Sequence, residues 1–323
     1  MKTISELTGL AVPTVSRALN DAPDIGEATK VRVRETAARI GYIPNRAGVR
    51  LRTGKTNVVS LVLSTEHDMM NFTARLISSV ASTLRTTPYH MIVTPYTPNE
   101  NPMVPVRYLV ETGSADAIIL NQTQPEDPRV AYLLERGFPF VTHGRTDWCD
   151  KHPYVDFDNR AFGALAVEKL VARGRRNLLL IAPPQTHSYS KHMIAGARTA
   201  AAEAGIELTI SPLVTSDSTS SIVRSSVETA VTGKMPVDGI VCGSTNSALG
   251  TVAGLEAAGL QLGKALDVVA KEPIPFLELF RPEMIVVQEN VAAAGEALAR
   301  AALQANEKPD EPPVQILFRP EAD

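Results

Sequence analysis

From residue 57 to its end, the chain alternates short apolar runs with longer segments of helical periodicity. Short apolar runs favour buried strands, whereas apolar positions that recur every three or four residues favour helices. Two series of strands and crossover helices, one beginning at residue 58 and one at residue 177, predict an α/β protein with two doubly wound parallel sheets. Ligands of such folds bind at the carboxyl ends of the strands, so a binding crevice is expected between the sheets.

The segments behind this prediction follow one another in a regular order. The predicted strands are 58–63, 90–93, 117–120, 138–142, 177–182, 239–242, 266–270, 284–287 and 314–318. The predicted helices are 72–84, 160–173, 190–204, a helix that ends near Gly259, and 291–304.

Residues 1–45 follow a different pattern, which predicts a unit of three short helices. A first helix ends at Gly9, a second begins near Val12, and a third ends before Gly41, and glycine is favoured just after a helix. Helix, glycine turn and second short helix form the layout of a helix-turn-helix, whose second helix enters the DNA major groove. The apolar residues expected to form its core are Leu7, Leu10, Val15, Leu19, Val33, Ala37 and Ile40.

Charge is distributed unevenly along the 323 residues, although the net charge is only -3. Residues 1–55 contain ten Lys/Arg and five Asp/Glu, a net charge of +5, whereas the remainder contains 22 and 30, a net charge of -8. A basic N-terminal segment on an acidic body is the asymmetry expected of a DNA-binding module joined to a larger domain.

The segment 44–56 joins these two parts and carries four basic residues around one large apolar residue, Leu51. Free in solution, this composition favours a disordered linker. On DNA it can fold as a helix, with Leu51 as a wedge between base steps of the minor groove.

Several function classes lack their sequence signals. Two distant cysteines, Cys149 and Cys242, supply neither a disulfide framework nor a Cys-rich zinc spacing. The sequence contains no His-Glu-x-x-His, no Gly-x-Ser-x-Gly and no Gly-x-Gly-x-x-Gly after a strand, so no enzyme, metal site or cofactor is predicted. Without a signal peptide or a run of eighteen apolar residues, the protein is expected to be cytoplasmic, with no membrane partner.

Motifs spread over the whole chain carry a family resemblance. They are Thr14-Val-Ser-Arg17 with Asn20, Ile40-Gly-Tyr-Ile-Pro-Asn-Arg46, Leu51-Arg-Thr-Gly-Lys-Thr56, Asp116-Ala-Ile-Ile-Leu, His143-Gly-Arg145, Asp158-Asn159 and Gly174-Arg-Arg-Asn-Leu. With these motifs in this order, the chain resembles the lactose and galactose repressor family (LacI/GalR) over essentially its whole length.

The resemblance implies a helix-turn-helix DNA-binding domain at 1–45, a hinge segment at 46–57 and an effector-binding and dimerisation domain at 58–323. The last of these would resemble a periplasmic sugar-binding protein of two lobes. Lobe 1 would comprise about 58–169 and 290–314, and lobe 2 about 170–289 and 315–323. The absence of leucine heptads at the end of the sequence favours a homodimer over a tetramer.

On the DNA side, the resemblance assigns contacts with a palindromic operator to the second helix and to the segment after the third. These residues are Val12, Pro13, Thr14, Ser16, Arg17, Asn20, Tyr42, Asn45, Arg46, Leu51 and Arg52. Val12 and Pro13 carry no hydrogen-bonding side chain and can contact only thymine methyl groups, which leaves polar readout to Thr14 and Arg17. Pro13 is also normal in a first helical turn, so helix initiation is its alternative role.

In the crevice, the resemblance assigns contacts with a sugar or glycoside effector to residues from both lobes. These residues are Phe72, Arg145, Trp148, Asp158, Lys191, His192, Met193, Ser244, Asn246, Glu272 and Gln288. Several differ from the family pattern, since Met193 stands where the family often has Arg, and Glu272 follows Lys271 where the family has Phe-Asp.

Alternatives remain for three of these residues. Trp148 either stacks on a sugar or packs on the edge of a lobe. Asp158 either accepts ligand hydroxyl groups or forms a turn. Arg145 either contacts the effector or pairs with a carboxylate.

The function predicted from these observations is a sequence-specific transcriptional repressor of carbohydrate-related genes, released from operator DNA by its effector. A regulator that needs a corepressor, and a sugar-binding module without operator control, are the alternatives. In bacteria such a repressor would be associated with the nucleoid.

Overall fold

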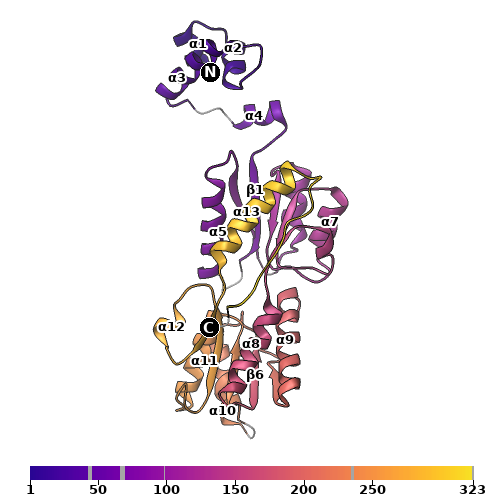
Figure 1. Ribbon diagram of the computed structural model, residues 1–323, viewed down its shortest axis with the longest axis vertical. Helices are drawn as coiled ribbons and strands as arrows, with labels where there is room; N and C mark the ends of the chain where they lie inside the picture. The colour runs from indigo at the N-terminus through magenta and orange to yellow at the C-terminus, as the bar shows by residue number, and fades with distance from the viewer. Residues whose placement is uncertain (43–45, 66–69, 98, 234–235, 322–323) are drawn as a thin grey trace. The chain divides into compact units, whose positions relative to one another are not determined.

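The computed structural model of the protein describes residues 1–42, 46–65, 70–97, 99–233 and 236–321. The chain divides into two compact units, residues 1–56, termed the headpiece, and residues 57–323, termed the body (Figure 1). Among the helices of the described residues, none is both long and apolar enough to span a bilayer.

Three helices pack together in the headpiece, namely α1 (Lys2–Thr8), α2 (Val12–Leu19) and α3 (Glu27–Arg39). Gly9 ends α1 with a φ of 68°, a left-handed conformation that glycine adopts without strain. Pro13 lies in the first turn of α2, where its missing N–H has no partner to lose. The three-helix headpiece is therefore confirmed, and a fourth helix, α4 (Arg46–Thr53), follows it in the chain.

The headpiece core consists of small and medium-sized side chains. Its buried members are Ile4, Val15, Ala18, Val33 and Ala37, and Leu10, Leu19, Ile25 and Tyr42 pack against them. The core positions predicted for Leu7 and Ile40 are wrong, because these side chains are 52% and 38% exposed. Ile4 and Thr8, four residues apart, form the buried face of α1 instead, while Ile40 is the residue just after the end of α3.

The first sheet of the body contains six parallel strands in the order β11-β5-β4-β3-β1-β2. Their bounds are β1 (Val58–Ser64), β2 (His90–Tyr96), β3 (Ala117–Leu120), β4 (Phe140–His143), β5 (Tyr154–Phe157) and β11 (Gln315–Phe318). The accompanying helices are α5 (Met70–Leu84), α6 (Met103–Glu111), α7 (Pro128–Arg136), the short 3₁₀ helix η1 (Cys149–Lys151) and α13 (Val291–Glu307).

The second sheet contains five parallel strands in the order β10-β9-β8-β6-β7. Their bounds are β6 (Asn177–Ile181), β7 (Glu207–Ile210), β8 (Gly239–Cys242), β9 (Asp267–Glu272) and β10 (Ile285–Gln288). The helices are α8 (Asn159–Ala172), α9 (Ser188–Ala204), α10 (Ser220–Thr232), α11 (Thr245–Ala257) and α12 (Leu277–Phe280). Two doubly wound parallel sheets, as predicted, therefore form the body.

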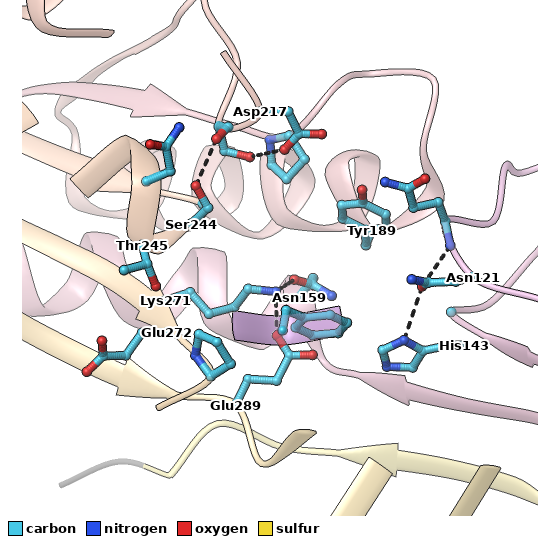
Figure 2. Close-up of a pocket in the computed structure, with 18 of the residues that line it drawn as sticks. Asn121, His143, Asn159, Tyr189, Asp217, Ser244, Thr245, Lys271, Glu272 and Glu289 are labelled. Atoms are coloured by element: carbon cyan, nitrogen blue, oxygen red, sulfur yellow. Dashed lines mark hydrogen bonds and ion pairs between the residues drawn. The ribbon is translucent and has the colours of Figure 1, made fainter. Parts of the chain in front are cut away.

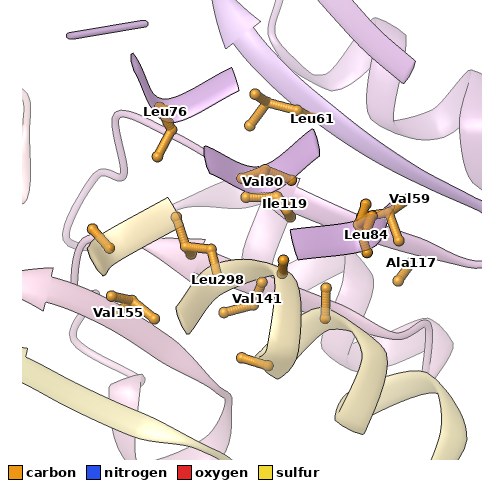
Figure 3. Close-up of a cluster of buried hydrophobic side chains, with 14 of the residues drawn as sticks. Val59, Leu61, Leu76, Val80, Leu84, Ala117, Ile119, Val141, Val155 and Leu298 are labelled. Carbon is orange, nitrogen blue, oxygen red and sulfur yellow. The ribbon is translucent and has the colours of Figure 1, made fainter. Parts of the chain in front are cut away.

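Helices cover both faces of each sheet. On the first sheet, α5 and α13 bury Leu76, Val80 and Leu298 against Leu61 and Ile119 (Figure 3). The opposite face carries α6 and α7, whose apolar residues pack with alternate residues of β1 and β3. Because β1 is buried over its whole length, it reads in the sequence as an unbroken apolar run.

The first crossing between the sheets lies at Asp158, not near residue 169 as predicted. Helix α8 begins at Asn159, and its residues Phe162 and Leu170 are buried in the core of the second sheet. Figure 1 shows α8 beside α9. At their contact, a Cβ on Gly163 would lie 2.2 Å from the carbonyl oxygen of Met193, so only glycine permits this approach.

The final strand also departs from the prediction, which placed 315–323 in the second lobe. Strand β11 pairs with β5 in the first sheet, with Gln315 opposite Tyr154. Ile316 and Phe318 pack against the core of that sheet, which explains the pairing. Up to Phe318, the described chain therefore passes between the sheets twice, after β5 and after β10.

Candidate functional site

A cavity of about 380 Å³ is lined by residues at the carboxyl ends of strands from both sheets. This is the location that a doubly wound architecture predicts for a ligand. Its lining residues are Phe72, Asn121, Gln122, His143, Gly144, Asp156, Asn159, Pro183, Tyr189, Ser216, Asp217, Gly243, Ser244, Thr245, Asn246, Leu249, Lys271, Glu272, Pro273 and Glu289.

On the first-sheet side, an aromatic pair and an amide form the wall. Phe72, near the start of α5, stacks on the His143 ring with centroids 5.5 Å apart. The His143 Nδ1 and the Asn121 Oδ1 lie 3.2 Å apart, so the imidazole donates to the amide oxygen (Figure 2). Burial lowers the pKa of His143, which makes this ring a neutral hydrogen-bonding group.

On the second-sheet side, an ion pair lies between the two crossing points of the chain. The Lys271 Nζ is 2.8 Å from a Glu289 carboxylate oxygen and donates to the Asn159 Oδ1 at 3.1 Å (Figure 2). It also lies 5.1 Å from the centroid of the Phe157 ring. Because Asn159 begins α8 and Glu289 follows β10, this lysine ties together the segments at which the chain passes from one sheet to the other.

Small polar side chains at the start of α11 form the far wall. The Ser244 hydroxyl accepts from the Ser247 N–H at 3.1 Å and caps the helix, and it donates to the Ser216 carbonyl at 2.8 Å. The Asn246 amide donates to the Ser218 carbonyl at 2.8 Å. Within the described part of the chain, the buried Thr245 hydroxyl has no hydrogen-bond partner, which leaves it available to a ligand.

Behind the cavity, Arg145 pairs with the buried Asp156 at 2.8 Å and lies 4.0 Å from Asp158. Burial raises the pKa of Asp156, and the Arg145 charge opposes this effect. Of these three residues, only Asp156 lines the cavity. The geometry therefore favours the ion-pair alternative for Arg145.

Four of the predicted effector residues line the cavity, namely Phe72, Ser244, Asn246 and Glu272. Glu272 is 1% exposed, and one of its carboxylate oxygens accepts from the Leu277 N–H at 2.9 Å, at the start of α12. Burial raises the pKa of Glu272, and this backbone hydrogen bond opposes the rise. Glu272 thus holds the loop before α12 as well as lining the cavity.

The other predicted effector residues lie outside the cavity lining. Asp158 caps α8 by accepting from the Ala161 N–H at 3.0 Å, and Trp148 packs against the core of the first sheet. Met193 is fully buried in the core beneath α9. Lys191 and Gln288 are exposed, and His192 is half-buried. Their contact with an effector stays a prediction, except that the burial of Met193 argues against it.

Sequence reasoning missed several lining residues that a positional signal marks. Asn121, His143 and Lys271 stand at or just beyond the carboxyl ends of strands that were predicted correctly. Polar residues at these ends are expected to face a ligand in a doubly wound fold. Tyr189 and Asp217 do not directly follow a predicted strand. Tyr189 comes after the loop that leads into α9, and Asp217 comes after β7, a strand that was not predicted.

In the headpiece, the side chains predicted to read DNA occupy an accessible helix. Val12, Pro13 and Arg17 are exposed, and Thr14 and Ser16 are half-buried. Two others have structural contacts, since the Asn20 amide donates to the Ser16 carbonyl at 2.6 Å and Tyr42 packs against the headpiece core. Arg17 also pairs with Asp24, so its guanidinium is preoriented at the surface.

The segment after the third helix is described only in part. Asn45 lies outside the described residues, and Arg46 and Arg52 lie in α4, where the description covers their backbone. Leu51 is 91% exposed, which is unusual for a leucine and matches the requirement for a wedge that inserts into DNA.

Comparison with known families gives two matches that together cover most of the chain. Residues 1–45 match the profile described as bacterial regulatory proteins of the lacI family. Residues 59–310 match the profile described as periplasmic binding proteins and the sugar binding domain of the LacI family.

Individual relatives agree with these profiles. The HTH-type transcriptional regulator AglR of Rhizobium meliloti is 30% identical over 329 residues, which cover 99% of this chain and 92% of that protein. The HTH-type transcriptional regulator RafR of Escherichia coli is 35% identical over 191 residues, 58% of this chain and 56% of that protein.

Solved structures share the fold at lower identity. The lac repressor dimer bound to operator and the anti-inducer ONPF has a TM-score of 0.84 and 17% identity, covering 98% of this chain and 95% of that one. The complex of the transcriptional regulator CelR with cellobiose has a TM-score of 0.71 and 23% identity, covering 98% and 96%.

Proposed function

Because the chain belongs to the LacI family of bacterial regulatory proteins, we propose that it is a transcriptional repressor whose operator binding is released by a sugar-like effector. The working form is a homodimer on a palindromic operator, and its target genes concern carbohydrates. The helix-turn-helix domain at 1–45 reads DNA, the hinge at 46–57 transmits the signal, and 58–323 binds the effector.

The proposal of a sugar-like effector rests on the cavity whose wall is formed by both sheets. The cavity combines aromatic surfaces, Phe72 and Tyr189, with hydroxyl and amide groups from both sides. Aromatic faces together with a few placed polar groups suit a polyhydroxylated ring, and the volume of about 380 Å³ fits a small ligand. Since the wall comes from both sheets, a bound ligand would change the energy of their relative orientation.

The DNA proposal is supported by the chemistry of the headpiece. Residues 1–55 carry a net charge of +5 on an otherwise acidic chain, which favours contact with phosphates. The exposed Val12 and Arg17 of α2 and the exposed Leu51 of α4 would meet base edges and the minor groove.

The proposed mechanism is a shift between two populations. In the operator-binding state the hinge segments are helical and insert Leu51 into the minor groove. An effector that binds better to the other state releases them, and a useful switch needs a coupling of about 1–3 kcal/mol. A corepressor would use the same coupling with the opposite sign.

The test is fluorescence anisotropy on labelled DNA from upstream of the protein's own gene and its neighbours, at fixed salt. Each titration is repeated with glucose, galactose, cellobiose, maltose, sucrose, trehalose and raffinose. We expect tight, salt-dependent binding to one palindromic fragment and its loss with one sugar. If a sugar tightens operator binding, the effector is a corepressor and not an inducer. If the protein binds every fragment no more tightly than random DNA, the proposal is refuted.

Phe72→Ala and Trp148→Ala, which each remove an aromatic ring, separate the two candidate stacking residues. Loss of an aromatic stacking partner weakens binding by about 0.5–1.5 kcal/mol, or roughly three- to tenfold. We expect this loss in sugar affinity for Phe72→Ala only, because Trp148 packs against the core of the first sheet. The reverse result would assign the stacking role to Trp148.

A further inference from the structure

A buried ion pair lies directly behind the cavity wall. The side chains of Arg129 and Asp127 are joined by two hydrogen bonds, from Nε to Oδ1 at 2.9 Å and from Nη2 to Oδ2 at 2.6 Å. Their side chains are only 2% and 1% exposed. Although burial alone would raise it, the hydrogen bonds from Arg129 hold the pKa of Asp127 below its ordinary value. Burying a charged pair this deeply costs free energy because both groups lose their hydration. The other hydrogen bonds of the pair therefore indicate its role in the structure.

Asp127 also accepts from the Gln124 and Arg129 N–H groups at 3.1 and 2.9 Å, and Arg129 donates to the Tyr96 hydroxyl at 3.4 Å. The other hydrogen bonds of Arg129 go to the chain that leaves β3. The Arg129 Nη2 donates to two consecutive carbonyl oxygens, of Asn121 at 3.1 Å and of Gln122 at 3.0 Å. The backbone bends between these two carbonyls, where Gln122 has a left-handed φ of 53°. Because a non-glycine residue rarely adopts this conformation, the bend needs outside support, which the guanidinium supplies.

The bent segment 121–123 performs two tasks at once. Asn121 and Gln122 line the cavity, and Asn121 orients the His143 ring (Figure 2). The next residue reaches the second sheet's helices, since the Thr123 carbonyl accepts from the Ser188 N–H at 2.9 Å, at the first residue of α9. That helix also brings Tyr189 to the cavity.

The charge of Arg129 also acts across this contact. Burial, followed by the positive charge of Arg129, lowers the pKa of His187 to about 4. His187 immediately precedes α9 and stacks on Tyr189 with ring centroids 5.2 Å apart. At neutral pH the imidazole is therefore uncharged and can lie near the guanidinium without repulsion.

We propose that Arg129 is a positioning residue for the effector cavity, although it does not line the cavity itself. It holds 121–123 in the bend that presents Asn121 and Gln122 to a bound sugar and that docks Thr123 on α9. Ligand affinity and the contact between the lobes then depend on the same guanidinium. This inference rests on the proposed function for its ligand readout, but its backbone readout is independent of any ligand.

The variants are Arg129→Met, which removes all the donors, and Arg129→Lys, which keeps a charge for Asp127 but not the planar fork. The control is Arg175→Met, because Arg175 donates to the buried Asp267 at 2.7 Å, Arg173 remains as a second partner of Asp267 at 2.8 Å, and neither Arg175 nor Asp267 lines the cavity. Sugar affinity is measured by calorimetry with the panel sugar that changes operator binding, and operator affinity is measured without sugar.

We expect at least a tenfold loss of sugar affinity in Arg129→Met and a smaller loss in Arg129→Lys. If Arg129→Met does not fold, Arg129→Lys provides the test, because its charge still pairs with Asp127. Operator affinity without sugar should stay within threefold of the native protein. Arg175→Met should lower the melting temperature but leave sugar affinity unchanged. Native sugar affinity in both Arg129 variants, or an equal loss in the control, would overturn the proposal.

Hydrogen exchange supplies the readout that needs no sugar. Peptides covering 117–127 and 186–192 should exchange faster in both Arg129 variants than in the native protein or in Arg175→Met. Unchanged exchange there would refute the positioning role even if no panel sugar binds. A native protein that binds no sugar but shows this exchange pattern would instead count against the proposed function alone.

Discussion

The headpiece and the body of this protein rest on different kinds of interaction. Among the described residues of the headpiece, five that are buried and apolar form the core, and ion pairs such as Arg34–Asp21 lie at the surface. In the body, long helices cover both faces of two sheets, and the Arg129–Asp127 pair is almost completely buried. Ion pairs at the surface contribute little to the free energy of unfolding, so the stability of the headpiece depends on its small apolar core. The body has a larger apolar core, which offsets the cost of burying charged groups around a cavity.

The largest expected effect comes from the headpiece core. Ile4→Ala removes a fully buried side chain, and such a change costs about 2–5 kcal/mol, as much as a domain this small has to lose. We expect operator binding to be lost while sugar binding and the thermal transition of the body stay unchanged, as calorimetry and anisotropy would report. Leu7→Ala on the same helix is the control, because Leu7 is exposed. An equal shift of the body transition would show that the two units do not differ in this way.

Acid should weaken the body before the headpiece. The pKa of His187 is about 4 in the folded body against an ordinary 6.5, so the unfolded chain binds the extra proton as the pH falls between these values. The body should lose stability on the order of 2–3 kcal/mol over this window, and burial lowers the pKa of His143 in the same direction.

The headpiece contains no histidine, and among its described residues Asp21 is the group with a shifted pKa, which Lys30 lowers below 3.8. Its stabilisation should therefore persist until the pH falls below about 3.8. Urea titrations from pH 7 to 4, with Trp148 fluorescence for the body and headpiece amide signals by NMR, would check the difference. His187→Asn should flatten the slope for the body, and parallel pH profiles for the two units would contradict this account.

Helix caps give a smaller difference between the units. None of α1, α2 and α3 has a side-chain cap, whereas Asp158 caps α8 in the body. Asp158→Ala should destabilise the body by about 1 kcal/mol, and Asp158→Asn by much less, since Asn also caps well. Chemical denaturation measures both, and sugar titration adds a second test. If sugar response is lost in both variants while stability follows this pattern, Asp158 contacts the effector after all.

The smallest effect on stability is expected at the exposed leucines. Leu51→Ala and Leu213→Ala each truncate a side chain that is 91% exposed, one in α4 and one in the body. Both should leave the melting temperature within experimental error, because little apolar burial is lost. Only Leu51→Ala should weaken operator binding, by about tenfold or more, without changing sugar affinity. Equal operator affinities would refute the wedge.

Sequence patterns predicted most of the fold because its central strands are unbroken apolar runs. β1 and β3 are buried throughout and were located within a residue or two. β7 was missed because it is an edge strand whose residues Glu207–Ile210 alternate in exposure. The crossing at Asp158 was misplaced because the lobe bounds were taken from the resemblance, and the apolar residues of α8 do not indicate in the sequence which sheet the helix covers.

The candidate site was predictable where a residue follows a recognised strand and hidden where partners are distant in sequence. Ser244 and Glu272 were identified from the resemblance and line the cavity. The pairing of Lys271 with Glu289, and of Arg129 with carbonyl groups at 121–122, depends on packing between elements. Such contacts carry no local pattern in the sequence.

Reciprocal linkage between sugar binding in the body and operator binding by the headpiece is the first property to measure. If a sugar in the body weakens operator binding by the headpiece, the operator must weaken sugar binding by the same factor. Calorimetric titration of the effective panel sugar, with and without saturating operator DNA, measures this factor. We expect a five- to 150-fold loss of sugar affinity when the protein is bound to the operator, equal to the loss of operator affinity with sugar. Equal sugar affinities with and without operator would contradict this linkage.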